Sequence, residues 1–229
     1  MSKQKQAKRK PERRGFYKFL CILLGRIVRT TFRVRCTGVE NLPEKGGFIL
    51  CANHIGYPDP VILIAALPRQ LRFMAKEELF RVPGVGALAR GIGAVPVKRN
   101  TADLGAMRKI VETCQAGNGT AVFPQGHRYS GKDPTTTPVK HGIGMMAYMS
   151  EAPIIPVSIT MKGMKYALFR RTTIRLGKPM YYRDICGEEK GKAHYEKATQ
   201  AFFDEVCRLG GFLPPAHQDE TQEQKEPQA

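Results

Sequence analysis

Residues 47–67 have the sequence GFILCANHIGYPDPVILIAAL, and this stretch gives the strongest indication of the fold. Gly47 to Ala52 is an apolar run of strand length, which predicts a short buried strand. Val61 to Leu67 predicts a helix that ends before Pro68. The polar segment at 53–59 joins the two. Ligands and catalytic groups in open α/β sheets lie beyond the carboxyl ends of strands, so this segment is the first candidate for a functional site.

Strand and helix patterns continue to alternate along the rest of the chain. Further strands are expected at 71–75, 94–98, 120–123, 154–160 and 172–176, and helices at 77–90 (broken by Pro83), 104–116, 143–150 and 192–209. This alternation predicts an α/β domain with a layered, largely parallel central sheet flanked by helices. We assign the domain to residues 35–213.

The composition indicates a globular protein with anionic partners. The 229 residues are 42% hydrophobic and 25% charged, with a net charge of +17. Such a charge favours nucleic acid, acidic lipid, phosphorylated substrates or an acidic carrier protein as partners. The cysteines show neither a CxxC pair nor a regular spacing, which indicates reduced thiols in a cytosolic protein and excludes a zinc or disulfide framework. They lie at 21, 36, 51, 114, 186 and 207.

The two ends of the chain carry opposite charge. Residues 1–35 contain 12 Lys or Arg and one Glu, a net charge of +11, whereas residues 214–229 contain one Lys and four acids, a net charge of −3. Residues 1–14 and 214–229 are polar with little to bury, so both are expected to be disordered.

Residues 15–34 have the pattern of an amphipathic helix that follows the basic arm. At about 100° per residue, four basic side chains share an arc of about 80° opposite five apolar ones: Lys18, Arg26, Arg29 and Arg33 against Phe16, Leu20, Leu23, Leu24 and Ile27. No run reaches the ~18 apolar residues of a spanning helix. We expect a helix lying on an anionic membrane surface, which would make the protein peripheral or monotopic at the cytoplasmic face of the cell membrane. The alternative is an ordinary helix packed on its own domain.

His54 and Asp59 are the candidate catalytic pair. A neutral imidazole can take a proton from an attacking alcohol, and a nearby carboxylate can fix its tautomer and stabilise the imidazolium that forms. Each residue also has a simpler explanation. Asp59 could be a helix N-cap with Pro60 at the first helical position, and His54 could be a loop histidine. Their shared position at the end of a strand favours catalysis.

Two further segments place cations at strand ends. In FPQGHR, residues 123–128, Gly126 permits a tight turn whose N–H groups could face an anion, and Arg128 offers a planar fork suited to phosphate. The alternative is a turn with a solvated arginine. Lys98 and Arg99 end another predicted strand, where charges are usually only solvated. The segment APIIPV, residues 152–157, predicts a buried strand.

The order and spacing of these four blocks resembles the glycerolipid acyltransferase family, of which bacterial lysophosphatidic acid acyltransferases are central members. The family pattern Asn-His-x4-Asp is matched by Asn53, His54 and Asp59. The other blocks are matched by Val97-Lys98-Arg99, by Phe123, Pro124, Gly126 and Arg128 of Phe-Pro-Glu-Gly-Thr-Arg, and by Pro153 to Pro156. Lys140 lies where the family has a basic residue shortly before a glycine. The resemblance covers about residues 35–210, with Gln125 in place of the family's glutamate and His127 in place of its threonine.

The resemblance implies transfer of a fatty acyl group from acyl-CoA or acyl carrier protein to the free hydroxyl of lysophosphatidic acid, which gives phosphatidic acid. His54 would be the general base, and Asp59 would orient it. No cofactor and no metal are implied. The substrate-binding residues would be Asn53, Lys98, Arg99, Gln125, Gly126, Arg128 and Lys140. Because the family's acid is thought to organise the acceptor site, Gln125 leaves another lyso-lipid acceptor open.

Two other classes of function fit the sequence less well. A nucleic-acid-binding protein would explain the charge, but aromatic residues make up 8% of the chain and there is no tryptophan. The basic residues lie on an amphipathic face and at strand ends, which is atypical of a recognition helix or a stacking platform. An acyl-thioester hydrolase would have no use for phosphate-binding arginines.

Overall fold

A six-stranded sheet forms the centre of the structure, a computed structural model that describes residues 25–91, 94–97 and 104–213. The strand order is β1-β8-β7-β2-β6-β3. Every pairing in this sheet is parallel except that of β7 with β8. The predicted, largely parallel α/β sheet is therefore confirmed. Its strands are β1 (Arg35–Thr37), β2 (Phe48–Ala52), β3 (Leu71–Arg72), β6 (Gly119–Val122), β7 (Ile154–Met161) and β8 (Thr172–Leu176).

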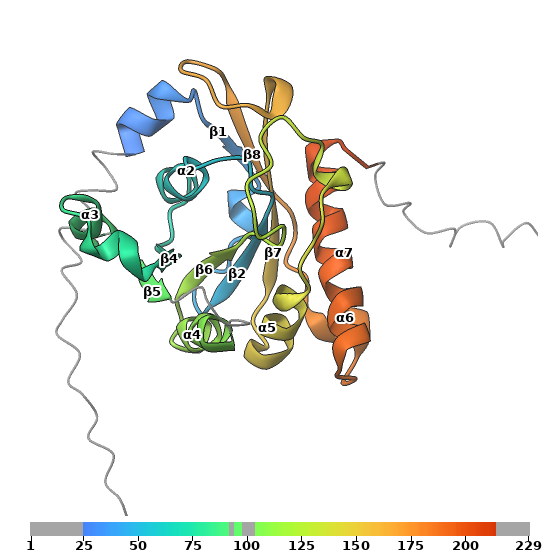
Figure 1. Cartoon of the computed structure of the whole chain (residues 1–229). Helices are drawn as coiled ribbons and strands as arrows, with labels where there is room; N and C mark the ends of the chain where they lie inside the picture. Colours follow the sequence, from blue (N-terminus) through green and yellow to red (C-terminus); the bar gives the residue numbers. More distant parts are fainter. Residues whose placement is uncertain (1–24, 92–93, 98–103, 214–229) are drawn as a thin grey trace, which may run out of the picture.

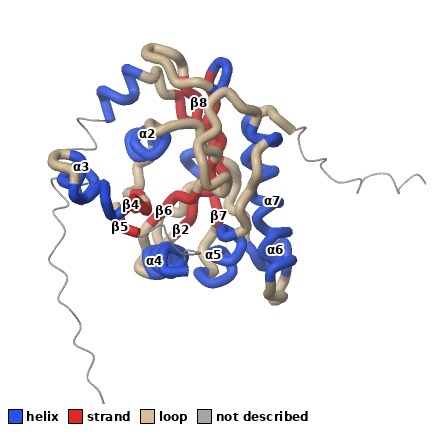
Figure 2. The backbone as a smooth tube through the Cα atoms, viewed as in Figure 1, coloured by secondary structure: helices blue, strands red, loops and turns tan. Residues whose placement is uncertain are grey.

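Helices cover both faces of the sheet (Figures 1 and 2). One face carries α2 and the helical residues 25–31; the other carries α4 to α7. A 3-10 helix (Glu77–Arg81) and α3 lie beyond the β3 edge. The bounds are α2 (Asp59–Ala66), α3 (Val85–Gly91), α4 (Leu104–Gln115), α5 (Gly142–Ser150), α6 (Tyr182–Cys186) and α7 (Lys192–Gly210).

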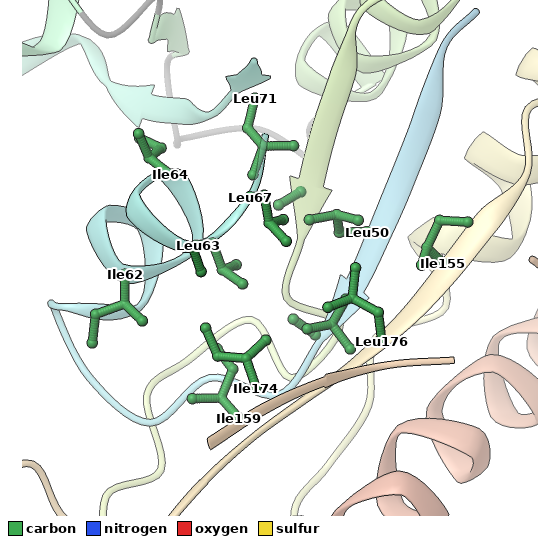
Figure 3. Close-up of a cluster of buried hydrophobic side chains, with 14 of the residues drawn as sticks. Leu50, Ile62, Leu63, Ile64, Leu67, Leu71, Ile155, Ile159, Ile174 and Leu176 are labelled. Carbon is green, nitrogen blue, oxygen red and sulfur yellow. The ribbon is translucent and has the colours of Figure 1, made fainter. Parts of the chain in front are cut away.

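Strand β2 divides the hydrophobic core into two parts. Phe48, Leu50 and Ala52 point into the cluster under α2, which Figure 3 shows, whereas Ile49 and Cys51 point into the cluster under α5 and α7. All five side chains are fully buried. A strand buried on both faces is a continuous apolar run, because successive side chains point to opposite faces. This placement explains the GFILCA sequence and puts the carboxyl end of β2 in the middle of the sheet.

The predicted single strand at 71–75 is wrong, because the chain leaves the main sheet after two residues. Leu71 and Arg72 form β3 against β6, and the following β4 (Met74–Lys76) pairs in parallel with β5 (Val95–Val97) in a separate two-stranded sheet. Phe73 lies between them with its side chain buried and its carbonyl accepting from the Val95 N–H at 2.7 Å.

The predicted amphipathic helix is only partly described, and its described end packs on the domain. Residues 25–31 are helical, and Val28 packs against the core below α2. Arg29 donates to the carbonyls of Ala65 and Ala66 at 2.9 and 3.1 Å. These carbonyls belong to the last turn of α2, so Arg29 caps that helix instead of extending the predicted cationic face. In the described ranges, no helix combines the length and apolarity that crossing a bilayer requires. Residues 1–14 and 214–229 lie outside those ranges.

The five described cysteines are free thiols, as expected for reduced residues. Four are buried, and burial raises the pKa of the Cys114 and Cys207 thiols to about 12. These residues therefore act as small apolar core side chains.

Candidate functional site

His54 and Asp59 form a hydrogen-bonded pair directly beyond the carboxyl end of β2. The imidazole Nδ1 lies 2.6 Å from Asp59 Oδ2. A carboxylate accepts only, so in the neutral imidazole Nδ1 carries the proton and Nε2 carries the lone pair. Nε2 has no hydrogen-bond partner among the described residues, and the side chain is 15% exposed. The geometry leaves Nε2 free to accept a proton from a substrate.

Asp59 is fully buried and is surrounded by donors. Its Oδ2 also accepts from the backbone N–H groups of Ile55 and Gly56 at 2.7 and 2.9 Å. The residue that precedes α2 as its N-cap is Pro58, and no side chain caps that helix. The alternative role of Asp59 as a capping residue is therefore not the one observed. The carboxylate is held by its own loop and stands ready to stabilise an imidazolium.

Tyr166 completes this group, although no pattern in the sequence indicates it. Its phenol donates to Asp59 Oδ1 across 107 residues of chain. Burial, and after it the negative charge of Asp59, raises the pKa of Tyr166 well above its usual range, so the phenol stays protonated as a donor. Gly56 makes room for the ring, because a Cβ there would lie 3.0 Å from a Tyr166 ring carbon.

The ring and backbone of His54 are fixed by the segment that follows β6. The imidazole stacks on Phe123 with 4.1 Å between ring centroids and 16° between planes. The His54 N–H donates to Gln125 Oε1 at 2.6 Å, and its carbonyl accepts from the Tyr129 N–H at 2.8 Å. The first and third sequence blocks thus form one unit around the histidine.

Gln125 is revised from a substrate contact to a positioning residue. Its side chain is buried, with Oε1 on the His54 N–H and Nε2 donating to Thr137 Oγ1 at 2.6 Å. Thr137 in turn donates to the Pro134 carbonyl at 2.6 Å. The hydroxyl proton of Thr137 is therefore committed, and an amide at 125 can donate to its oxygen whereas a carboxylate cannot. Thr137 explains how a glutamine fits where the family resemblance expects a glutamate.

Asn53 is likewise revised. Its side chain is buried, and both ends of the amide are used by the backbone of Ile159, with Nδ2 on the carbonyl at 2.9 Å and Oδ1 on the N–H at 2.8 Å. Asn53 therefore ties the end of β2 to β7, and its burial keeps the amide away from the surface.

Arg128 and Lys140 lie beside the turn at Gly126 and face outward. The Arg128 guanidinium stacks on the exposed Tyr57 ring, 3.8 Å from its centroid. It forms no ion pair with any carboxylate of the described residues. The Lys140 side chain crosses Gly126, whose added Cβ would meet Lys140 Cε at 2.8 Å. Two cations without carboxylate partners at one turn suit a phosphate group.

Gly126 itself serves the turn. Its φ is +70°, and its N–H donates to the Phe123 carbonyl at 3.0 Å. Contrary to the prediction, this N–H is therefore not available to an anion. Lys98 and Arg99 lie outside the described residues. Within the described residues, no group of three or more His, Cys, Asp or Glu side chains is placed to hold a metal ion.

Comparison with known proteins finds relatives of this chain. The profile of the family described as Acyltransferase matches residues 33–160. The chain is 30% identical to the 1-acyl-sn-glycerol-3-phosphate acyltransferase of Bacillus subtilis over 172 residues, which are 74% of this chain and 84% of that protein. It is 30% identical to the enzyme of the same name from Borreliella burgdorferi over 129 residues, 56% of this chain and 51% of that one.

A solved structure has the same fold. The 1-acyl-sn-glycerophosphate acyltransferase of Thermotoga maritima superposes with a TM-score of 0.65 at 23% sequence identity, over 87% of this chain and 81% of that chain. At this identity the similarity concerns the fold, which is the curled, mostly parallel sheet flanked by helices.

Proposed function

Because this chain belongs to the acyltransferase family, we propose that it transfers a fatty acyl group from an acyl thioester to the free hydroxyl of lysophosphatidic acid, giving phosphatidic acid. The names of the Bacillus and Borreliella relatives support this acceptor. The donor is acyl-CoA or acyl carrier protein, both of which are acidic and suit a chain with a net charge of +17.

The observation that carries the proposal is the free Nε2 of a histidine whose Nδ1 is held by a buried carboxylate. Nε2 of His54 accepts the hydroxyl proton while the hydroxyl oxygen attacks the thioester carbonyl carbon. Asp59 stabilises the imidazolium that forms. When the tetrahedral intermediate collapses, the C–S bond breaks and the imidazolium returns the proton to the departing thiolate. One ester bond is formed, one thioester bond is broken, and no acyl-enzyme is needed.

Arg128 and Lys140 hold the acceptor phosphate in this proposal. Both are exposed, and the Arg128 guanidinium rests over the Tyr57 ring without a competing carboxylate among the described residues. A guanidinium so placed can bind two phosphate oxygens at once. By the family resemblance, Lys98 and Arg99 would add to the same site. Reaction at the surface of a membrane, with the protein bound peripherally at its cytoplasmic face, would let the acceptor keep its acyl chain in lipid.

The test is an acyl-transfer assay with the purified full-length chain. Lysophosphatidic acid, three other lysophospholipids and a monoacylglycerol are each offered with acyl-CoA and with acyl carrier protein. We expect kcat/KM for lysophosphatidic acid to exceed that for the phosphate-free acceptor at least about tenfold, because the phosphate makes charge-assisted hydrogen bonds. Preference for another lysophospholipid would change the acceptor, and release of free fatty acid without transfer would indicate a hydrolase.

Tyr166→Phe should lower kcat about tenfold and leave both KM values unchanged. The substitution removes one hydrogen bond to a buried carboxylate, which is worth about 1.5–3 kcal/mol, part of which reaches the transition state through His54. Steady-state kinetics measures kcat and both KM values, and thermal unfolding measures any change in stability separately. The control is Tyr195→Phe on α7, whose ring contacts those of Tyr148 on α5 and Tyr182 on α6. An unchanged kcat for Tyr166→Phe would remove this residue from the positioning of Asp59.

A further inference from the structure

The turn between β7 and β8 presents two large apolar side chains to solvent. Leu168 and Phe169 are 70% and 67% exposed, the highest exposures of any large aliphatic side chain and any phenylalanine among the described residues. Phe169 has a φ of 59°, a conformation that is a genuine outlier for a bulky residue and costs about 1–3 kcal/mol. The turn therefore holds Phe169 outward at an energetic cost, which is unusual for a loop without a function.

Hydrogen bonds from three sides fix this conformation. The Phe169 N–H donates to the Thr31 carbonyl at 2.7 Å. The Arg170 guanidinium donates to the carbonyls of Lys162 and Lys165 at 3.1 and 3.0 Å, which closes the turn on itself. The Met164 carbonyl accepts from the Gly131 N–H at 2.8 Å. The apolar tip is preformed, so no ordering would be needed when it meets a partner.

Basic side chains lie on both sides of the tip. Lys162, Lys165 and Arg171 are exposed around it. The sequence from 152 to 183 contains no aspartate or glutamate. The bond to Thr31 places helical residues 25–31 beside the turn (Figure 1), and this helix adds the exposed Arg26 and Ile27, the latter 55% exposed. An apolar tip inside a cationic ring is complementary to a phospholipid interface with anionic headgroups.

We propose that the β7–β8 turn inserts Leu168 and Phe169 into the interface of an anionic phospholipid bilayer, with the surrounding lysines and arginines on the headgroups. The turn forms one continuous membrane-facing surface with residues 25–31. This inference adds a contact to the membrane association proposed above and does not depend on the acyl-transfer chemistry. It also fixes how the His54–Asp59 pair lies relative to the membrane, because Tyr166, on the same turn, donates a hydrogen bond to Asp59.

A tryptophan placed at the tip tests insertion directly, since the chain has no tryptophan and so gives no background signal. The full-length Phe169→Trp variant is mixed with vesicles of phosphatidylglycerol and phosphatidylcholine. We expect its emission to shift to shorter wavelength and to be quenched by brominated lipids. The matched control is Leu104→Trp on α4, where Leu104 is 52% exposed. The control should show neither change.

The contribution to binding is measured by vesicle sedimentation of the double variant Leu168→Ser with Phe169→Asn. Asparagine tolerates a positive φ, so the turn keeps its shape while the apolar groups are removed. We expect the partition coefficient to fall at least about tenfold. The control pair is Leu104→Ser with Met149→Ser, on α4 and α5.

Variants that remove positive charges separate the contribution of the basic side chains from that of the apolar tip. Lys165→Gln with Arg171→Gln should weaken binding to phosphatidylglycerol vesicles and leave the weaker binding to pure phosphatidylcholine unchanged. Lys190→Gln with Lys192→Gln, just before and at the start of α7 at the opposite end of the molecule (Figure 1), should change neither. The proposal is overturned if the protein sediments with vesicles while tryptophan at 169 stays in a water-like environment. It is equally overturned if the tip and control double variants partition alike. Neither readout involves turnover, so failure here leaves the acyl-transfer proposal standing.

Discussion

His54→Ala is expected to lower kcat about a thousandfold, within the range of ~10²–10⁴ typical of a general base. The alanine leaves no group at the position of Nε2, and the attacking hydroxyl then has to lose its proton to water. The fold should persist, because Asp59 keeps its bonds to Ile55, Gly56 and Tyr166. The loss of one of its four partners should cost about 1–3 kcal/mol of stability. Acyl-transfer kinetics and thermal unfolding of the same preparation measure both.

The matched control for this variant is His194→Ala. His194 lies on α7 and pairs with Glu189, away from the β2 end of the sheet. Its loss should leave kcat within about twofold of the wild type, as expected for a surface substitution away from the site. Turnover near the wild-type rate in His54→Ala would exclude the general-base mechanism.

Arg128→Ala should raise KM for lysophosphatidic acid about 10–100-fold and leave KM for the thioester donor unchanged. The variant removes a charge-assisted, bidentate contact worth about 1.5–3 kcal/mol. The dependence on this one side chain is strong because Arg128 rests on Tyr57 and pairs with no carboxylate of the described residues. Gln125 does not contribute to acceptor binding, since its amide is turned inward and bonded to His54 and Thr137.

Arg128→Lys sharpens the test. An ammonium supplies the charge but neither the fork nor the planar stacking surface, so it should restore only part of the acceptor affinity. Arg108→Ala, an exposed arginine on α4, serves as the control for general loss of positive charge. If acceptor KM is unchanged in Arg128→Ala, the phosphate role passes to Lys140 or Arg99.

The parts of the fold that could be predicted are those with a local pattern. The apolar run of β2, the stop at Pro68 and the alternation of elements gave the sheet and its flanking helices. The exit of the chain after Arg72 could not be predicted, because β3 and β4 are contiguous in sequence and differ only in which distant strand each one pairs with. Elements such as β1 and α6 are too short to show a period.

The candidate site divides in the same way. His54, Asp59 and Arg128 were predicted from residue type, spacing and position after strands, and the structure places the first two in contact. Tyr166 could not be found, since it lies in no motif and reaches Asp59 only through the β7–β8 turn. Asn53 and Gln125 were placed in the right region, but whether an amide faces a ligand or a backbone depends on partners such as Ile159 and Thr137 that no local pattern reveals.

The position of β2 in the sheet has a consequence for biosynthesis. Phe48 pairs with Gly119 on one side, and Ile49 pairs with Ile154 on the other. A ribosome releases the FILCA segment long before either partner strand has been made. During that interval it is an apolar strand with two open edges, the kind of segment that associates with other chains. The nascent chain should therefore need a chaperone until about residue 161 has emerged, and slower translation of the stretch between β2 and β7 would lengthen the period of risk.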